Sequence, residues 1–282
     1  MKHFLMITNT YKDEGHRLTD ELAACIREKG GICHCFISSG ETLVEAAPDH
    51  KDIPEETDCV LVLGGDGTLI RAAARLVGSG LPLIGVNLGT LGYLCELEES
   101  SVFAAIDQLM ADNYVIEERM MLAGSDGEKI SGIALNDIVL HRTGPMSVVS
   151  LIVYVNGEYL HTFRADGIIL STPTGSTGYN MSAGGPIVDP KAQMILVTPI
   201  NAHNLNSRSI VVGADEEIVI EIGRRRSQGD EVVEVSFDGD HAARLSVGEK
   251  ILIRRAMATA RILKLSNKSF LELLSKKMQA YT

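Results

Sequence analysis

The sequence has few positive charges and few cysteines, and it has no long hydrophobic run. Its 282 residues carry 26 Lys and Arg against 37 Asp and Glu, a formal net charge of −11. That deficit argues against a general nucleic-acid binder, because such proteins neutralise phosphates with clustered positive charge. The five cysteines are an odd number without a regular framework, which is typical of reduced thiols. With no stretch of membrane-spanning length and no secretory leader pattern, we expect a soluble cytoplasmic protein that binds neither nucleic acid nor membrane.

Several common nucleotide-binding and catalytic motifs are also missing. No G-x-x-x-x-G-K-[ST] loop occurs, and residues 65–70 (GDGTLI) fail the pattern G-x-G-x-x-G. Neither a G-x-S-x-G turn nor an H-E-x-x-H helix is present. These absences disfavour ordinary Rossmann and P-loop nucleotide sites, and they weaken hydrolase and zinc-protease interpretations.

Residues 1–112 alternate strand and helix patterns. Apolar runs of strand length cover 3–9, 32–37, 58–63 and 82–86, and helical spacing covers 18–29, 69–77 and about 102–110. Such alternation indicates βαβ units, so we predict an N-terminal α/β domain with a mostly parallel sheet.

The pattern changes near residue 113. From there to residue 262 we predict an all-β domain of short strands rich in Val and Ile, at 115–123, 138–142, 148–155, 159–163, 167–171, 210–212, 217–222, 232–238 and 250–255. In residues 263–282 an amphipathic pattern from Phe270 to Met278 predicts a helix that returns to pack on the first domain.

A glycine-rich turn interrupts the first domain at residues 61–68 (LVLGGDGT). A buried strand there opens into Gly64, Gly65 and Gly67, and a helical pattern follows Thr68. Glycines let a ligand approach the backbone, and a helix start offers free N–H groups, so the turn suits a phosphate. Asp66 would repel a phosphate, and it more plausibly faces a hydroxyl or a metal ion. A solvated glycine-rich connection remains the alternative at this point.

A second distinctive stretch covers residues 166–180 (DGIILSTPTGSTGYN). A strand runs into a turn with five hydroxyl side chains, two glycines and a rigid proline, and a helix start is expected near Thr177. Hydroxyls and backbone N–H groups can surround a polar ligand without adding charge. The alternative is a Ser/Thr-rich turn without a ligand, and Tyr179 could stack on a base or cover the core.

The third stretch is Asn136-Asp137. A side-chain amide matches the donor and acceptor edge of adenine, and a neighbouring carboxylate can accept both hydroxyls of a ribose. Because successive side chains of a strand point to opposite faces, both reach one ligand only at a bend or bulge. Taken alone, such a pair is more often a simple turn.

Together and in this order, the stretches resemble the signature of the NAD kinases. The similarity continues through residues 182–187 (SAGGPI), 205–212 (LNSRSIVV) and 237–239 (FDG), so it covers most of the chain. The resemblance implies transfer of the terminal phosphoryl group of ATP, with a divalent metal such as Mg²⁺, to the 2′-hydroxyl of the adenosine ribose of NAD. It also implies NAD bound between an α/β and a β domain, and a homodimer or homotetramer.

The resemblance further implies roles for individual residues. Asp66 would be the catalytic base, because an attacking alcohol needs its proton accepted. Phosphate and ATP contacts are expected from Gly64, Gly65, Gly67 and Thr68. NAD contacts are expected from Asp66, Gly67, Arg71, Asn136, Asp137, Arg164, Asp166, Thr174, Thr177, Gly178, Tyr179, Asn180, Met181 and Ser182.

Two positions depart from the family pattern. Gly178 stands where the family commonly has Ala, which removes no functional group. Asp240 stands where many members carry Gln, and its added charge could alter contact with the dinucleotide, so Asp240 is not assigned to the site.

Two other interpretations compete with a NAD kinase. Phosphofructokinases and diacylglycerol kinases also carry a GGDG turn, but this sequence resembles them only through that motif. A nucleotide sensor without catalytic activity is the other possibility, and it would not need Asp66.

Overall fold

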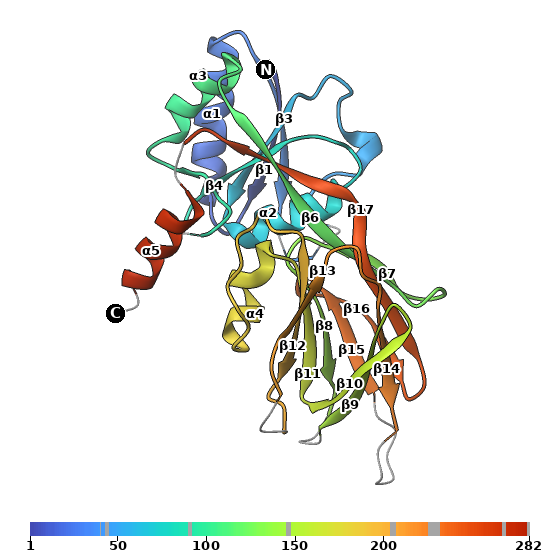
Figure 1. Ribbon diagram of the computed structural model, residues 1–282. Coiled ribbons are helices and arrows are strands. Elements are labelled where there is room, and N and C mark those ends of the chain that lie inside the picture. The colour runs from blue at the N-terminus through green and yellow to red at the C-terminus, as the bar shows by residue number, and fades with distance from the viewer. Residues whose placement is uncertain are drawn as a thin grey trace. The chain divides into compact units, whose positions relative to one another are not determined.

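The computed structural model describes residues 1–39, 41–42, 45–89, 92–144, 148–203, 207–224, 232–266 and 269–280. The chain forms two compact units (Figure 1). Unit 1 comprises Met1–Arg119 and Thr259–Thr282, and unit 2 comprises Met120–Ala258. Two strands, β6 (Val115–Ser125) and β17 (Lys250–Lys264), each begin in one unit and end in the other.

Unit 1 is built on a parallel sheet. Its strand order is β2-β1-β3-β4, and a short strand and the end of β17 also pair with β4. The strands are β1 (His3–Asn9), β2 (Ile32–Ser38), β3 (Cys59–Gly64), β4 (Leu83–Asn87) and β5 (Leu97–Glu98). Every residue of β3 and β4 is buried, which explains why these strands appear in the sequence as continuous apolar runs.

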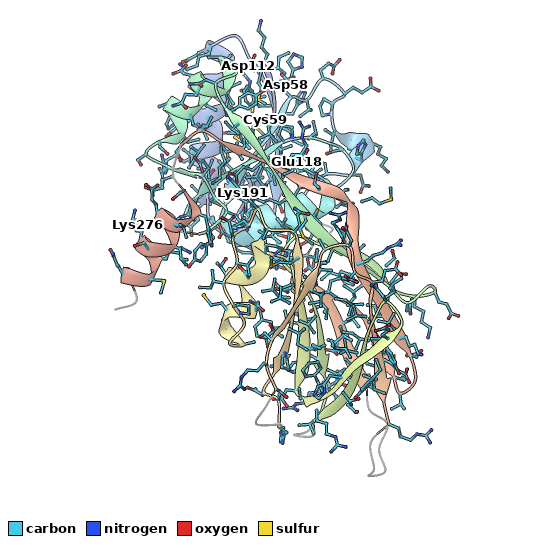
Figure 2. All side chains as sticks on the ribbon, viewed as in Figure 1. Asp58, Cys59, Asp112, Glu118, Lys191 and Lys276 are labelled. Atoms are coloured by element: carbon cyan, nitrogen blue, oxygen red, sulfur yellow. The ribbon has the colours of Figure 1, made fainter. Side chains whose placement is uncertain are left out.

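Unit 1 also contains helices. They are η1 (Glu14–His16), α1 (Arg17–Glu28), η2 (His50–Asp52), α2 (Asp66–Arg75), α3 (Val102–Met110) and α5 (Phe270–Ala280). Leu18, Leu22 and Ile26 form the buried stripe of α1 at helical spacing. With side chains of β1, β3, β4 and α3 they form the core of unit 1, in which Cys59 is fully buried (Figure 2).

Structural contacts occupy the amino ends of the parallel strands in unit 1. Asp58 accepts the N–H groups of Lys2 and His3 at 2.6 and 2.9 Å, and Asp112 pairs with the amino group of Met1 at 2.6 Å (Figure 2). The carboxyl ends carry the glycine-rich turn that follows β3. Ligands of parallel α/β sheets bind at that end.

Unit 2 is almost entirely β-structure. One antiparallel sheet has the order β13-β12-β11-β8-β15-β16, and β10, β9, β14 and the first part of β17 form a second antiparallel group. The strands are β7 (Ser131–Ala134), β8 (Asp137–Arg142), β9 (Val149–Val155), β10 (Glu158–Ala165), β11 (Gly167–Ser171), β12 (Met194–Ile200), β13 (Ile210–Gly213), β14 (Ile218–Gly223), β15 (Val232–Phe237) and β16 (Asp240–Ser246). Two short helical segments, η3 (Thr174–Thr177) and α4 (Tyr179–Ser182), follow β11.

The predicted fold class, a mostly parallel α/β part and a β-rich part, is confirmed. The sequence patterns missed β5, β7, β12 and β16, and β17 continues to Lys264 instead of ending at Arg255. Pro199 hides β12, and β16 begins with Asp240, His241 and two alanines, which are weak strand formers. None of the helices in the described part of the chain has both the length and the apolar character that a membrane crossing requires.

Candidate functional site

The glycine-rich turn joins β3 directly to α2. Gly64 ends the strand and Asp66 is the first residue of the helix. A Cβ atom on Gly64 would lie 2.4 Å from the Thr68 hydroxyl oxygen, so only glycine fits there. That hydroxyl accepts the side-chain N–H of Asn9 at 3.3 Å, which ties the turn to the end of β1. The predicted strand-turn-helix arrangement is therefore present.

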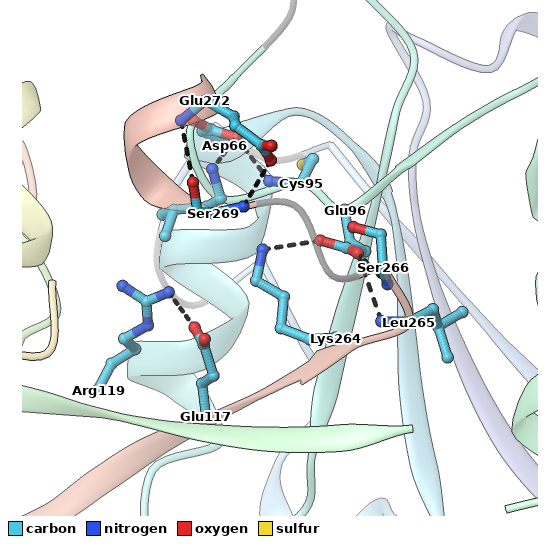
Figure 3. A network of polar contacts seen from close by, with 11 residues as sticks. Asp66, Cys95, Glu96, Glu117, Arg119, Lys264, Leu265, Ser266, Ser269 and Glu272 are labelled. Atoms are coloured by element: carbon cyan, nitrogen blue, oxygen red, sulfur yellow. Dashed lines mark hydrogen bonds and ion pairs between the residues drawn. The ribbon is translucent and has the colours of Figure 1, made fainter. Parts of the chain in front are cut away.

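The Asp66 carboxylate is held by three consecutive backbone N–H groups. Tyr93 donates to Oδ2, and Leu94 donates to Oδ1 at 3.2 Å. Cys95 also donates to Oδ1, at 3.0 Å (Figure 3). A Cβ atom on Gly92 would lie 1.9 Å from Asp66 Oδ1, so this position has room only for glycine. The segment 92–95 thus fixes the orientation of the carboxylate, a contact that the sequence analysis missed.

A buried ion pair anchors the same segment. Glu96 is 6% exposed in its side chain and binds the Lys264 ammonium at 2.7 Å. It also accepts the N–H groups of Leu265 and Ser266 at 3.3 and 2.8 Å (Figure 3). Burial by itself would raise the pKa of Glu96, but the bonds from Lys264 and Ser266 hold that pKa below its ordinary value. The ionised Glu96 connects segment 92–95 to the end of β17.

Helix α5 brings a positive charge to this site. Its first turn is capped reciprocally, since Ser269 N–H donates to Glu272 at 2.9 Å and Glu272 N–H donates to Ser269 at 3.2 Å. Further along, the Lys277 ammonium lies 3.7 Å from the centroid of the Tyr93 ring. Burial lowers the pKa of Lys277, and the negative charge of Asp66 partly opposes this shift. Lys277 is therefore within electrostatic reach of Asp66.

Gly67 and Arg71, two further predicted site residues, differ from Asp66 in their surroundings. Gly67 is exposed, and a Cβ atom there would meet nothing within 4 Å. The fold therefore gives no steric reason for a glycine at position 67. Arg71 lies one helical turn after Gly67 on α2 and is partly buried.

In unit 2, Asn136 occupies a bend and Asp137 is the first residue of β8. Asp238, from the turn between β15 and β16, accepts the N–H groups of Leu135, Asn136 and Asp137 at 2.7, 2.7 and 3.1 Å. The bend is the geometry that lets neighbouring side chains serve one ligand. Asp238 was noted in the sequence only as part of a motif, without a role.

Asp137 and Asp238 form a pair of closely spaced carboxylates. Burial and the negative charge of Asp238 raise the pKa of Asp137 to about 7. Burial also raises the pKa of Asp238 to about 6, against the effect of its three N–H donors, and Asp240 adds to the increase. Carboxyl groups shifted in this way are typical of functional sites.

The hydroxyl-rich stretch packs directly against Asn136. A Cβ atom on Gly175 would lie 2.2 Å from the Asn136 carbonyl oxygen, and one on Gly178 would lie 3.5 Å from the Asn136 side-chain nitrogen. The Thr172 hydroxyl donates a hydrogen bond to the Leu135 carbonyl at 2.6 Å. In contrast, Asn136 Oδ1 and Thr174 Oγ1 are buried without a hydrogen-bond partner among the described residues. Such atoms in a folded protein call for a partner.

The predicted residues of α4 divide into internal and exposed ones. Asn180 is fully buried, donates to Ser176 and Pro186 carbonyls at 3.2 and 3.0 Å, and accepts the Thr198 hydroxyl at 2.7 Å. Its side chain therefore holds the segment together. Tyr179, Met181 and Ser182 are exposed, and the Thr177 hydroxyl lies 3.5 Å from the Thr174 carbonyl.

Arg164 and Asp166 flank the junction between β10 and β11. Arg164 is exposed, whereas Asp166 pairs with Arg142 at 2.7 Å and accepts the Asn201 amide at 3.1 Å. The hydrogen bond from Asn201 and the pairing with Arg142 lower the pKa of Asp166. Of the family-like stretches, Leu205 and Asn206 lie outside the described residues.

Comparisons with known proteins identify the family. Residues 42–114 match the model of the ATP-NAD kinase N-terminal domain, and residues 135–265 match that of the ATP-NAD kinase C-terminal domain. A NAD kinase of Agathobacter rectalis is 57% identical over 283 residues, which cover 100% of both chains. This chain belongs to the NAD kinase family. A NAD kinase of Lachnospira eligens is 42% identical and covers 99% of this chain and 100% of its own.

Solved NAD kinase-like structures share the fold. Yeast NADH kinase, crystallised with NADH, superposes with a TM-score of 0.86 at 23% identity and covers 99% of this chain and 88% of its own. A NAD kinase from Archaeoglobus fulgidus, in complex with ATP, gives a TM-score of 0.79 at 22% identity, with 99% of both chains covered. The chain therefore shares its fold with these two structures.

Proposed function

We propose that this protein is a NAD kinase that transfers the terminal phosphoryl group of ATP to the 2′-hydroxyl of the adenosine ribose of NAD. Membership in the NAD kinase family over the full chain carries the proposal. The carboxylate of Asp66, fixed at the start of α2, supports it from the structure. The product is NADP.

Asp66 is the proposed catalytic base. Attack on phosphorus requires a positioned group that takes the proton of the ribose hydroxyl. Three backbone N–H groups orient the Asp66 carboxylate before substrate arrives, so little reorganisation is needed during the reaction. Gly64, Gly65, Gly67 and Thr68 would place the start of α2 against the ATP phosphates, where backbone N–H groups and the helix dipole favour negative charge.

The adenosine part of NAD would be bound by unit 2. The Asn136 amide suits adenine, the Asp137 carboxylate suits the ribose hydroxyls, and the Thr174 hydroxyl adds a further polar contact. Asn136 Oδ1 and Thr174 Oγ1, which have no hydrogen-bond partner in the part of the chain that the structure describes, support this assignment, because a bound nucleotide would satisfy them. Other contacts are proposed from Arg71, Arg164, Asp166, Thr177, Gly178, Tyr179, Asn180, Met181 and Ser182.

A divalent metal, most simply Mg²⁺, is part of the proposal. Within the described ranges no three His, Cys, Asp or Glu side chains gather into a metal-binding group. Mg²⁺ at phosphoryl-transfer sites is commonly held by substrate phosphates with one or two carboxylates. A metal held mainly by the ATP phosphates would arrive with ATP and neutralise the charge of those phosphates.

We further propose a homodimer or homotetramer in the cytoplasm. All five cysteines are free thiols, in keeping with a reducing compartment. The homo-oligomer is what the resemblance to the NAD kinases implies. Light scattering of the purified protein would give the mass of the assembly.

The direct test is to incubate the purified protein with NAD, ATP and Mg²⁺ and to measure NADP with an NADP-specific dehydrogenase. We expect one NADP for each ADP formed. If nucleotide binds and no NADP accumulates, the protein is a sensor and the proposal is wrong. Parallel reactions with NADH, polyphosphate, fructose 6-phosphate and diacylglycerol define the donor and acceptor and separate this activity from other kinases with a GGDG turn.

A further inference from the structure

The turn between β15 and β16 carries an unusual carboxylate. It consists of Asp238 and Gly239, whose φ values are 51° and 87°. A two-residue hairpin with two left-handed residues is the preferred geometry for Asp-Gly, and the side chain of a turn Asp commonly accepts a hydrogen bond from its own backbone two residues on. Here Asp238 instead directs its carboxylate to the backbone of residues 135–137, about a hundred residues earlier in the chain.

These contacts satisfy much of the backbone of residues 135–137. Asp238 accepts all three N–H groups, and its own N–H donates to the Asp137 carbonyl at 3.0 Å. On the other side, the Thr172 hydroxyl and N–H donate to the carbonyls of Leu135 and Asn136 at 2.6 and 2.8 Å. The segment is thus clamped from two directions, while the Asn136 side-chain oxygen has no partner among the described residues.

The clamp has an electrostatic cost. Asp137 is 6% exposed, and Asp238 places a second carboxylate close to it. Asp240, at the start of β16, contributes a third negative charge that acts on Asp238. An amide at position 238 would avoid the repulsion, but its nitrogen cannot accept a hydrogen bond, so one of the two acceptor oxygens would be lost. The carboxylate therefore holds all three N–H groups of residues 135–137, at the cost of a second negative charge that acts on Asp137.

We propose that Asp238 is a positioning residue of the NAD site, which fixes residues 135–137 so that the Asn136 amide and the Asp137 carboxylate meet the adenosine part of NAD. This inference rests on the proposed NAD kinase activity. Asp238 acts through the segment it holds and has no direct role in phosphoryl transfer.

Two variants separate the geometry of this residue from its charge. Asp238→Asn retains the size and the left-handed conformation but loses one acceptor oxygen and the charge. We expect the KM for NAD to rise about 10- to 100-fold, the usual effect of breaking charge-assisted hydrogen bonds, with less than a threefold change in kcat and in the KM for ATP. Asp238→Glu retains the charge but is longer, so it displaces residues 135–137 and also raises the KM for NAD.

The pH profile of kcat/KM for NAD provides a readout that a purely structural role would not change. The negative charge of Asp238 is one of two causes that raise the pKa of Asp137. In Asp238→Asn the acid limb of the profile should therefore move to lower pH, and in Asp238→Glu it should stay in place. Glu234→Gln, which removes an exposed charge from the same hairpin, should leave both KM values and the profile unchanged.

The outcomes decide between explanations. If wild-type protein makes NADP and either Asp238 variant keeps a KM for NAD within twofold of wild type, the positioning role is wrong while the kinase activity stands. An acid limb of Asp238→Asn that is unmoved or shifted to higher pH also contradicts it. If Asp238→Asn does not fold, Asp238→Glu decides alone, through its KM for NAD measured at pH 8. Absence of NADP from the wild-type reaction overturns the kinase proposal itself.

Discussion

Gly92 lies against the Asp66 carboxylate so closely that a Cβ atom at position 92 would be 1.9 Å from Asp66 Oδ1. The two residues are 26 positions apart in the sequence, yet the Asp66 carboxylate leaves no room for a side chain at position 92. The next three N–H groups, from Tyr93 to Cys95, bind this carboxylate. Gly92 therefore permits the approach of the segment that orients the proposed base.

Gly92→Ala should abolish most of the activity. The added methyl group has to displace the Asp66 carboxylate, so we expect kcat to fall at least about 100-fold, as for loss of a positioned general base. The affinity for NAD, which depends mainly on unit 2, should remain within a fewfold of wild type. Gly89→Ala is the matched control, because its Cβ would meet only the flexible end of Lys12 at 3.3 Å. Equal kcat values for the two variants would contradict the role of Gly92.

Gly67→Ala should separate activity from stability. A Cβ atom at position 67 meets nothing within 4 Å, and Ala is favoured over Gly in helices by about 0.5–1 kcal/mol. Thermal stability should thus be equal or slightly higher, while the KM for ATP rises about tenfold because the methyl group occupies the phosphate approach. Unchanged ATP kinetics would show that phosphates do not approach the backbone at Gly67.

Asp137→Asn should stabilise the protein at alkaline pH. The pKa of Asp137 is raised from 3.8 to about 7 in the folded protein. Below pH 3.8 the Asp137 carboxyl is protonated in the folded and in the unfolded protein, and its contribution to stability is fully present. As the pH rises toward the folded pKa of about 7, the unfolded protein ionises this group first, so that contribution is progressively lost. The amide avoids that charge, so the gain should be on the order of 2–4 kcal/mol at pH 8 and at most half of that at pH 5. Denaturant unfolding at both pH values checks this, and a gain that grows toward pH 5 would contradict it.

The same titration should appear in catalysis by the wild-type enzyme. If the ionised Asp137 accepts the ribose hydroxyls, the KM for NAD should rise as the pH falls below about 7. The KM for ATP should not follow it over this range. Initial rates between pH 5.5 and 8.5 test this, and a flat KM for NAD would exclude the proposed contact through the carboxylate.

Lys277→Met should lower kcat about tenfold. The ammonium group of Lys277 lies over Tyr93 and within electrostatic reach of Asp66, where a positive charge can stabilise a transferring phosphoryl group. Methionine keeps much of the contact with the ring but removes the charge. Lys276→Met, at the neighbouring exposed position of α5 (Figure 2), should have no effect. A higher kcat for Lys277→Met would show that the helix restrains the site.

Short-range patterns predicted much of this molecule. The strand-turn-helix around Asp66 and the span of α3 follow from apolar runs, glycines and helical spacing within about ten residues. The bend at Asn136, which the two side chains would need to serve one ligand, is also present.

Contacts between distant segments could not be predicted in the same way. Tyr93 to Cys95 bind Asp66 across 27 to 29 positions, and Asp238 binds residues 135–137 across 101 to 103. The reason for a glycine at position 92 becomes clear only when the structure shows that the Asp66 carboxylate lies against it. The same holds for Asn180, because its buried hydrogen bonds to Ser176, Pro186 and Thr198 are not visible in the motif that contains it.

The most direct test of the account is the single-turnover rate of NADP formation by Asp66→Asn. Asn keeps an oxygen for the N–H groups of Leu94 and Cys95 but is a far weaker base. With saturating NAD and ATP, and with NAD affinity verified by calorimetry, we predict a loss on the order of 10² to 10⁴-fold in rate. A rate within threefold of wild type would show that another group takes the proton and that Asp66 is not the catalytic base.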